Sequence, residues 1–62
     1  MTMTPEQIAQ ALRDGSRYQN ATMTVYLSRS GCYVAWPHDA DPFEMSERHA
    51  IDFILAYDLQ VS

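Results

Sequence analysis

Residues 22–36, TMTVYLSRSGCYVAW, decide the fold that the sequence predicts. Larger apolar side chains alternate with other residues on both sides of a central Arg-Ser-Gly segment, which is typical of two half-buried strands joined by a tight turn. Gly31 can adopt the positive φ that hairpin turns require. Pro37 then ends the second strand, because it has no N–H to donate to a neighbouring strand. The stretch therefore predicts a β-hairpin over about residues 22–36.

The length of the turn decides which side chains share a face of this hairpin. A turn of three residues would place Leu27 opposite Tyr33 and separate Trp36 from the other large apolar residues. A turn of two or four residues would place Leu27 opposite Val34. Because one buried face normally fixes the register, we predict an even turn with a single apolar face. That face would hold Met23, Val25, Leu27, Val34 and Trp36, and the other would hold Thr24, Tyr26, Ser28, Tyr33 and Ala35.

A first helix is predicted over about residues 4–14. Thr4 is a favourable N-cap residue, and Gln7 three positions later completes a capping box. Apolar residues then recur on one face at the helical spacing, and Gly15 is suited to end the helix. Residues 16–20 are predicted to be a linker.

A second helix is predicted over about residues 42–59. Asp41 can serve as its N-cap, with Glu44 completing a second capping box. Alternatively, Ser46 is the cap and residues 41–45 form a turn of their own. The apolar face of this helix is wide, which suggests burial on more than one side. Its members are Ala50, Ile51, Phe53, Ile54, Leu55 and Tyr57.

These elements predict a single small α+β domain over residues 1–62, ordered helix, β-hairpin, helix, with the hairpin packed on the C-terminal helix. A chain of this length buries only about 60% of the surface of its unfolded form, and its one cysteine, Cys32, excludes an internal disulfide. In a monomer both hairpin edges would be unpaired, and the hairpin face with the tyrosines would be exposed to solvent. The apolar surface of the second helix would also be wider than the rest of the chain can cover. We therefore predict a homodimer or a stable partner.

The N-terminal residues lack the basic flank and the apolar run of a signal peptide. No stretch approaches the ~20 apolar residues that a membrane-spanning helix needs. One unpaired thiol is consistent with a reducing compartment. We expect a cytoplasmic protein without a membrane association.

The chain carries eight acidic residues against four arginines and no lysine, for a net charge of −4. Nucleic-acid affinity comes largely from clustered basic residues that neutralise phosphates, so nucleic acid is an improbable partner. The alternative of a nucleic-acid-binding module has one argument in its favour. Tyr26 and Tyr33 on an exposed hairpin face would offer a stacking platform, with Arg29 at the hairpin tip for a phosphate.

The residues for metal binding or catalysis lack the spacing that such sites need. His38, Asp39 and Asp41 lie in one loop, whereas Glu44 and His49 are five residues apart and do not share a helix face. Cys32 is predicted on the apolar hairpin face, without a catalytic signature around it. We therefore predict no catalytic, cofactor-binding or metal-binding residue, and a small metal-binding protein or enzyme subunit is only an alternative.

Protein binding is the function that remains. Acidic and aromatic residues are concentrated between positions 26 and 47, and aromatic anchors with a charged rim are typical of protein interfaces. We predict a non-enzymatic inhibitor or adaptor that binds a protein with a basic surface. Small acidic inhibitors of phages and mobile elements, including anti-CRISPR and anti-restriction proteins, share this size and charge, which is an analogy and not a motif. The candidate interface residues are Tyr26, Tyr33, Trp36, Asp39, Asp41, Phe43, Glu44 and Glu47.

Overall fold

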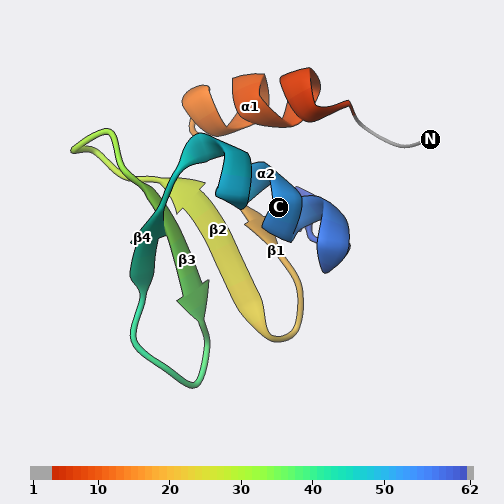
Figure 1. Ribbon diagram of the computed structural model, residues 1–62. Helices are drawn as coiled ribbons and strands as arrows, with labels where there is room; N and C mark the ends of the chain where they lie inside the picture. Colours follow the sequence, from red (N-terminus) through yellow and green to blue (C-terminus); the bar gives the residue numbers. More distant parts are fainter. Residues whose placement is uncertain (1–3, 62) are drawn as a thin grey trace.

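The computed structural model describes residues 4–61, which form two helices and a five-stranded antiparallel sheet (Figure 1). The predicted mixed α+β class is confirmed, whereas the predicted ends of the domain, residues 1 and 62, lie outside the described residues. Three strands that the sequence analysis did not predict flank the hairpin, so the helix–hairpin–helix order is incomplete. The elements are α1 (Pro5–Arg13), β1 (Tyr18–Gln19), β2 (Met23–Leu27), β3 (Tyr33–Pro37), β4 (Phe43–Met45), α2 (Glu47–Ala56) and β5 (Gln60–Val61). The strand order in the sheet is β4-β3-β2-β1-β5.

Helix α1 begins and ends as predicted. The Gln7 N–H donates to Thr4 Oγ1 at 3.2 Å, and the Thr4 N–H donates to Gln7 Oε1 at 2.9 Å, so both halves of the capping box form. Pro5 occupies the first turn, where its missing N–H costs nothing. Gly15, with φ of +95°, then lets the chain turn away towards the sheet.

The register of the β2–β3 hairpin differs from the predicted one. Leu27 lies opposite Tyr33. The Ser28 N–H donates to the Cys32 carbonyl at 2.8 Å, and the Gly31 N–H donates to the Ser28 carbonyl at 3.0 Å. The turn therefore has three residues, 29–31, and the prediction of an even turn is wrong. Gly31 has φ of +91°, as expected for the left-handed residue that closes a three-residue hairpin turn.

Packing under the helices explains why this register forms. Ala35 and Ala50 are both fully buried, so their small side chains let β3 lie close to α2. The predicted register would have turned Ala35 away from the helix and put the much larger Trp36 on the helix side. Counting apolar residues per face missed this requirement, because it ignored side-chain volume at the contact between helix and sheet.

Both helices pack on the same face of the sheet, where the hydrophobic core lies (Figure 1). The core consists of Ile8, Leu12, Tyr18, Met23, Val25, Ala35, Ala50, Ile54 and Leu59. Within residues 4–61 no helix covers the opposite face, which we call the open sheet face. Its side chains from β2, β3 and β4 are Thr24, Tyr26, Val34, Trp36 and Glu44.

Residues 16–20 are not a simple linker, because they contain β1. Tyr18 pairs with Val25 and is only 2% exposed, so its ring is part of the core. Asn20 Oδ1 accepts hydrogen bonds from the Thr22 and Met23 N–H groups, at 2.8 and 2.9 Å, and these bonds close a tight turn into β2. Two residues of strand are too few for alternation to be recognised in the sequence.

The prediction that Asp41 caps the second helix is wrong, and the alternative cap, Ser46, is confirmed. Ser46 Oγ accepts the His49 N–H at 3.3 Å. Residues 43–45 form strand β4 instead of a helical turn, because they pair with β3 across the sheet. Helix α2 also ends earlier than predicted, at Ala56, so that β5 can follow and pair with β1.

The additional strands change the predicted edges of the hairpin. Strand β1 pairs with β2 and strand β4 pairs with β3, so neither edge of the hairpin is unpaired. The prediction of unpaired hairpin edges, one of three features that suggested a homodimer, is therefore wrong. The new edges, β4 and β5, are only three and two residues long, and short edge strands offer little backbone to another chain.

Candidate functional site

Three aromatic rings meet at one end of the helix-covered side. Phe53 of α2 and Tyr57, the C-cap residue of this helix four positions later, stack with centroids 5.4 Å apart and an interplanar angle of 19°. Phe43 reaches them from β4 and contacts Phe53 edge to face, at 6.2 Å and 64°. Phe43 is 44% exposed and Tyr57 is 54% exposed. We call Phe43, Phe53 and Tyr57 the aromatic cluster.

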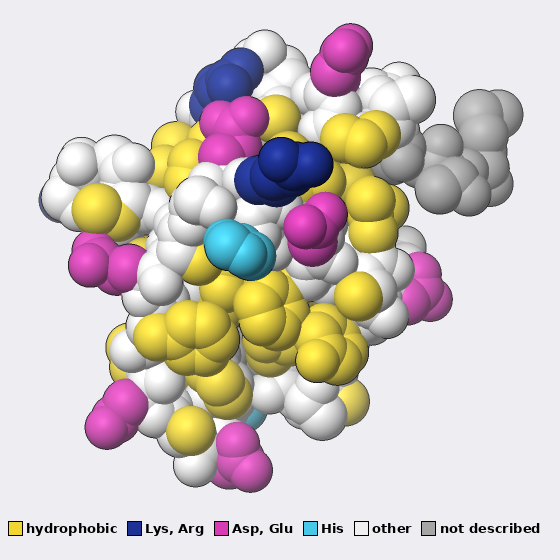
Figure 2. All heavy atoms as spheres, in the orientation of Figure 1, with side chains coloured by type: hydrophobic (Ala, Val, Ile, Leu, Met, Phe, Trp, Pro, Cys, Tyr) yellow, Lys and Arg dark blue, Asp and Glu magenta, His cyan; other side chains and the backbone are white. Residues whose placement is uncertain are grey.

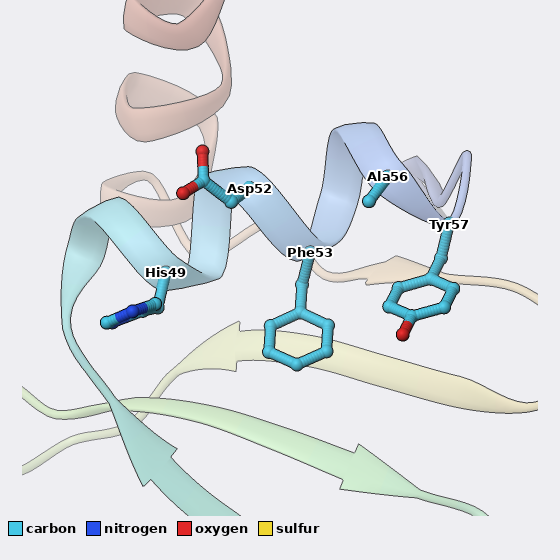
Figure 3. Close-up of a pocket in the computed structure, with 5 residues that line it drawn as sticks. All are labelled: His49, Asp52, Phe53, Ala56 and Tyr57. Carbon is cyan, nitrogen blue, oxygen red and sulfur yellow. The ribbon is translucent and has the colours of Figure 1, made fainter.

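A shallow cavity of about 230 Å³ lies beside this cluster on α2. The cavity is lined by His49, Asp52, Phe53, Ala56 and Tyr57. Figure 3 shows the three rings pointing towards the sheet, whereas the Asp52 carboxylate points away from it. Pockets for small-molecule ligands usually measure about 300–1,000 Å³ and enclose their ligand. This cavity is smaller and open, so it suits one inserted side chain better than a substrate.

The charge around the aromatic cluster is acidic. Figure 2 shows a patch of hydrophobic side chains in the lower half of this face, and the charged side chains that border it there are all acidic. In the sequence, the one arginine after position 29 is Arg48, which precedes the cavity residue His49. A salt bridge joins Arg13 to Glu47. Among residues 4–61, the carboxylates within four positions of a cluster residue that make no salt bridge are Asp39, Asp41, Glu44, Asp52 and Asp58. Glu44 lies on the open sheet face, and the Asp52 carboxylate points away from the rings.

The open sheet face carries a second group of aromatic residues. Trp36 is 46% exposed and lies opposite Thr24, one row along the sheet from Tyr26 and Val34. The Arg17 guanidinium lies over the Tyr26 ring, 5.0 Å from its centroid. A cation at this distance from a ring is attracted by the electron density of the ring face. This face therefore combines aromatic, aliphatic and charged side chains.

Tyr33 and Glu47, both predicted as interface residues, join the helices to the sheet. The Tyr33 hydroxyl donates to Glu47 Oε2 at 2.8 Å, and Arg13 Nη2 donates to the same oxygen at 2.9 Å. These two hydrogen bonds lower the pKa of Glu47 below its ordinary value. Partial burial, followed by the bond to Glu47, raises the pKa of Tyr33. The three residues come from β3, α2 and α1, so their contacts hold the two layers together.

The structure separates the remaining predicted residues into three groups. Tyr26, Trp36 and Glu44 lie on the open sheet face, whereas Phe43 belongs to the aromatic cluster on the other side. The acidic loop with Asp39 and Asp41 connects the ends of β3 and β4, and both side chains are exposed. Trp36 and Phe43 are close in sequence but lie on opposite sides of the sheet.

Two members of the aromatic cluster were missed as site residues. Phe53 and Tyr57 were assigned only to the wide apolar face of the second helix. The width of that face could have identified them. Ala50 and Ile54 face the core, so Phe53 and Tyr57, a second pair of large side chains one turn apart, must project outside the core.

The residues considered for metal binding and nucleophilic chemistry do not assemble into a site. His38 Nε2 lies 2.9 Å from Thr24 Oγ1 on the edge of the open sheet face, whereas the His49 ring contacts Ser46 on α2. Across residues 4–61 no three side chains of histidine, cysteine, aspartate or glutamate are grouped as metal ligands. Cys32 is half-buried at the end of the hairpin turn, not in the apolar face where it was predicted. None of the helices in the described part of the chain has the length and apolar character to cross a bilayer.

No protein-family model, curated protein or solved structure matches the chain.

Proposed function

We propose that this chain is a small, non-enzymatic protein-binding module, an inhibitor or adaptor, whose partner contacts the aromatic cluster. The observation that supports this function best is the exposure of Phe43 and Tyr57 around the half-buried Phe53. Aromatic side chains carry much of the binding energy in protein interfaces, and they concentrate where a partner excludes water. Here three rings are held in fixed contact by two different elements, so little side-chain entropy remains to be lost on binding.

The chemistry of the partner follows from the charges near the cluster. A basic protein surface with one protruding apolar side chain would fill the cavity on α2 and face Asp39, Asp41 and Asp58. Opposite charges at the rim of an interface mainly accelerate association and select the partner. Such a surface is found on nucleic-acid-binding proteins, which is consistent with an inhibitor of the anti-CRISPR or anti-restriction kind acting in the cytoplasm. The module itself would contact the protein and not its nucleic acid.

Parallel affinity capture tests this function. The wild type, Tyr57→Ala and Leu55→Ala are immobilised and exposed to the same nuclease-treated lysate of the source cells. Leu55 is a suitable control because it is also exposed, at 45%, but lies two residues from Phe53 and hence on the far side of α2. One stoichiometric protein retained by the wild type and Leu55→Ala, and lost with Tyr57→Ala, is the expected result. Equal retention by all three would contradict a role for the cluster.

A further inference from the structure

We propose that Asn20 is a positioning residue for the aromatic cluster. Its side-chain amide holds the end of α2 and thereby keeps the Tyr57 ring stacked on the Phe53 ring. The importance of this role rests on the proposed function, because the aromatic cluster is the proposed partner site. The geometry itself belongs to the free chain and is tested without a partner.

The Asn20 side chain connects the turn between β1 and β2 with the end of α2. Its Oδ1 accepts the Thr22 N–H at 2.8 Å, and the Met23 N–H and the Thr22 hydroxyl at 2.9 Å each. Its Nδ2 donates to the Tyr57 carbonyl at 3.2 Å, a contact between residues 37 positions apart. A backbone N–H can only donate and a carbonyl can only accept, so these neighbours fix which end of the amide faces the helix.

The end of α2 needs support from another part of the chain. Tyr57 is the C-cap residue, and Asp58 after it has φ of +53°. The Leu59 N–H donates to the Ile54 carbonyl at 3.0 Å, which is one of the two bonds of a Schellman motif. Glycine usually occupies the left-handed position of this motif, because a side chain there strains the backbone. Since this chain has an aspartate at that position, contacts from other segments must stabilise the conformation, and the Asn20 amide supplies one.

The ring of Tyr57 depends on how α2 ends. Phe53 lies inside the helix, and Phe43 lies in β4. Tyr57 instead follows Ala56, the last helical residue, and its ring is 54% exposed, so burial does little to hold it. Figure 3 shows this ring pointing towards the sheet, a direction that follows from the backbone of the cap. Loss of the Asn20 bond should therefore release the Tyr57 ring and leave the edge-to-face contact of the two phenylalanines intact.

Asparagine meets both demands of position 20. An aspartate would still accept the bonds of the turn, but it would place a carboxylate oxygen against the Tyr57 carbonyl, and two acceptors repel. A serine could accept bonds of the turn, but its side chain is one atom shorter and would not reach the helix as well. Either exchange therefore separates the bond to α2 from the bonds within the turn.

Asn20→Asp tests the bond in the free chain. Nuclear magnetic resonance measures the Overhauser contacts of the Phe53 ring with Tyr57 and, separately, with Phe43. At pH 7 we expect the Tyr57 contacts to lose more than about half of their wild-type intensity, and the Phe43 contacts to stay, because only the helix end has lost a donor. Gln19→Glu exchanges an amide for a carboxylate on an exposed side chain one residue earlier, and it should keep both sets of contacts.

Acid should restore the stack in Asn20→Asp. An aspartate carboxyl group takes up a proton between about pH 5 and about pH 3, and it then carries an O–H that can donate to the Tyr57 carbonyl. The Tyr57 contacts of this variant should therefore recover over that range, whereas those of the wild type should stay constant. Asp58 is present in both proteins, so the wild type accounts for its protonation. A general loss of structure would not recover in acid.

Three results would overturn the proposal: a wild type without contacts between Tyr57 and Phe53, unchanged contacts in Asn20→Asp at pH 7, or losses that acid does not reverse in the folded variant. If Asn20→Asp does not fold at pH 7, Asn20→Ser decides, because it should lose the Tyr57 contacts at every pH, and keeping them would overturn the proposal. A variant that loses the stack but binds the captured partner like the wild type would contradict the proposed function instead, so the two failures are separate results.

Discussion

Tyr26 and Tyr33 lie on adjacent strands but on opposite faces of the sheet. Tyr33 is opposite Leu27 and reaches Glu47 beneath the helices, whereas Tyr26 is opposite Val34 and lies under the Arg17 guanidinium on the open sheet face. The two rings therefore cannot form the stacking platform on which a nucleic-acid-binding function depended. Each instead has a separate role, Tyr33 in joining the layers and Tyr26 at the exposed surface.

The Tyr33 hydroxyl is expected to stabilise the fold. Tyr33→Phe removes its hydrogen bond to Glu47 and should lower the free energy of unfolding by about 1 kcal/mol. For a domain of this size, that corresponds to a fall in melting temperature of roughly 4–8 °C. Thermal unfolding followed by circular dichroism measures it. Tyr26→Phe is the matched control, and an equal fall in both variants would contradict the role assigned to the bond.

The stabilisation that Glu47 gives to the fold should be lost in acid. Because its hydrogen bonds from Tyr33 and Arg13 lower its pKa in the folded state, the stabilisation is complete above the ordinary value of 4.5 and is lost as the pH falls through the lowered pKa. Melting temperatures of the wild type and Glu47→Gln should therefore differ most near neutral pH and converge in acid. Parallel curves from pH 7 to strongly acidic solution would show that the carboxylate is not linked to folding.

Leu12 and Leu55 provide a matched test of the core. Leu12 is completely buried between α1 and the sheet, whereas Leu55 is 45% exposed. Leu12→Ala should destabilise by about 2–5 kcal/mol, which is comparable with the total of roughly 3–9 kcal/mol expected for a chain of this length. Leu55→Ala should change stability by less than about 0.5 kcal/mol. Urea unfolding of both variants measures the difference. A similar loss of unfolding free energy in both would contradict the assignment of Leu12, and not Leu55, to the core.

Gly31 should be required by its backbone conformation and not by lack of space. Its φ is +91°, and a Cβ built there would meet no atom within 4 Å. Gly31→Ala should therefore cost about 1–2 kcal/mol through the left-handed conformation alone, and Gly31→Asn should cost less, because asparagine tolerates that region. Denaturant unfolding ranks the three proteins. If alanine were as stable as glycine, the three-residue turn would be in question.

Local signals in the sequence predicted the elements that local contacts stabilise. Helix α1 was predicted correctly because Thr4 and Gln7 satisfy each other within one turn. Strand β4 was missed because Asp41 and Glu44 have the spacing of a capping box. The conformation of residues 43–45 is decided instead by their pairing with β3. Strands β1 and β5 have only two residues each, too few for a period to show.

The candidate site was only partly predictable for a related reason. Phe43 was identified because it is an aromatic residue in an acidic segment, but its partners Phe53 and Tyr57 come from α2 and meet it only in the folded chain. The hairpin register decided the rest. A shift of one residue moves every side chain to the other face, so Tyr33 and Trp36 exchanged the surfaces predicted for them.

The most direct test of the proposed function is a calorimetric titration of the purified captured partner with the wild type, Tyr57→Ala and Leu55→Ala, after all three are shown to melt alike. If the aromatic cluster is the binding site, Tyr57→Ala should weaken binding by more than about 1 kcal/mol, or fivefold in the dissociation constant, and Leu55→Ala should bind as the wild type does. Equal dissociation constants for the wild type and Tyr57→Ala would contradict the central claim that this chain binds its partner through the aromatic cluster.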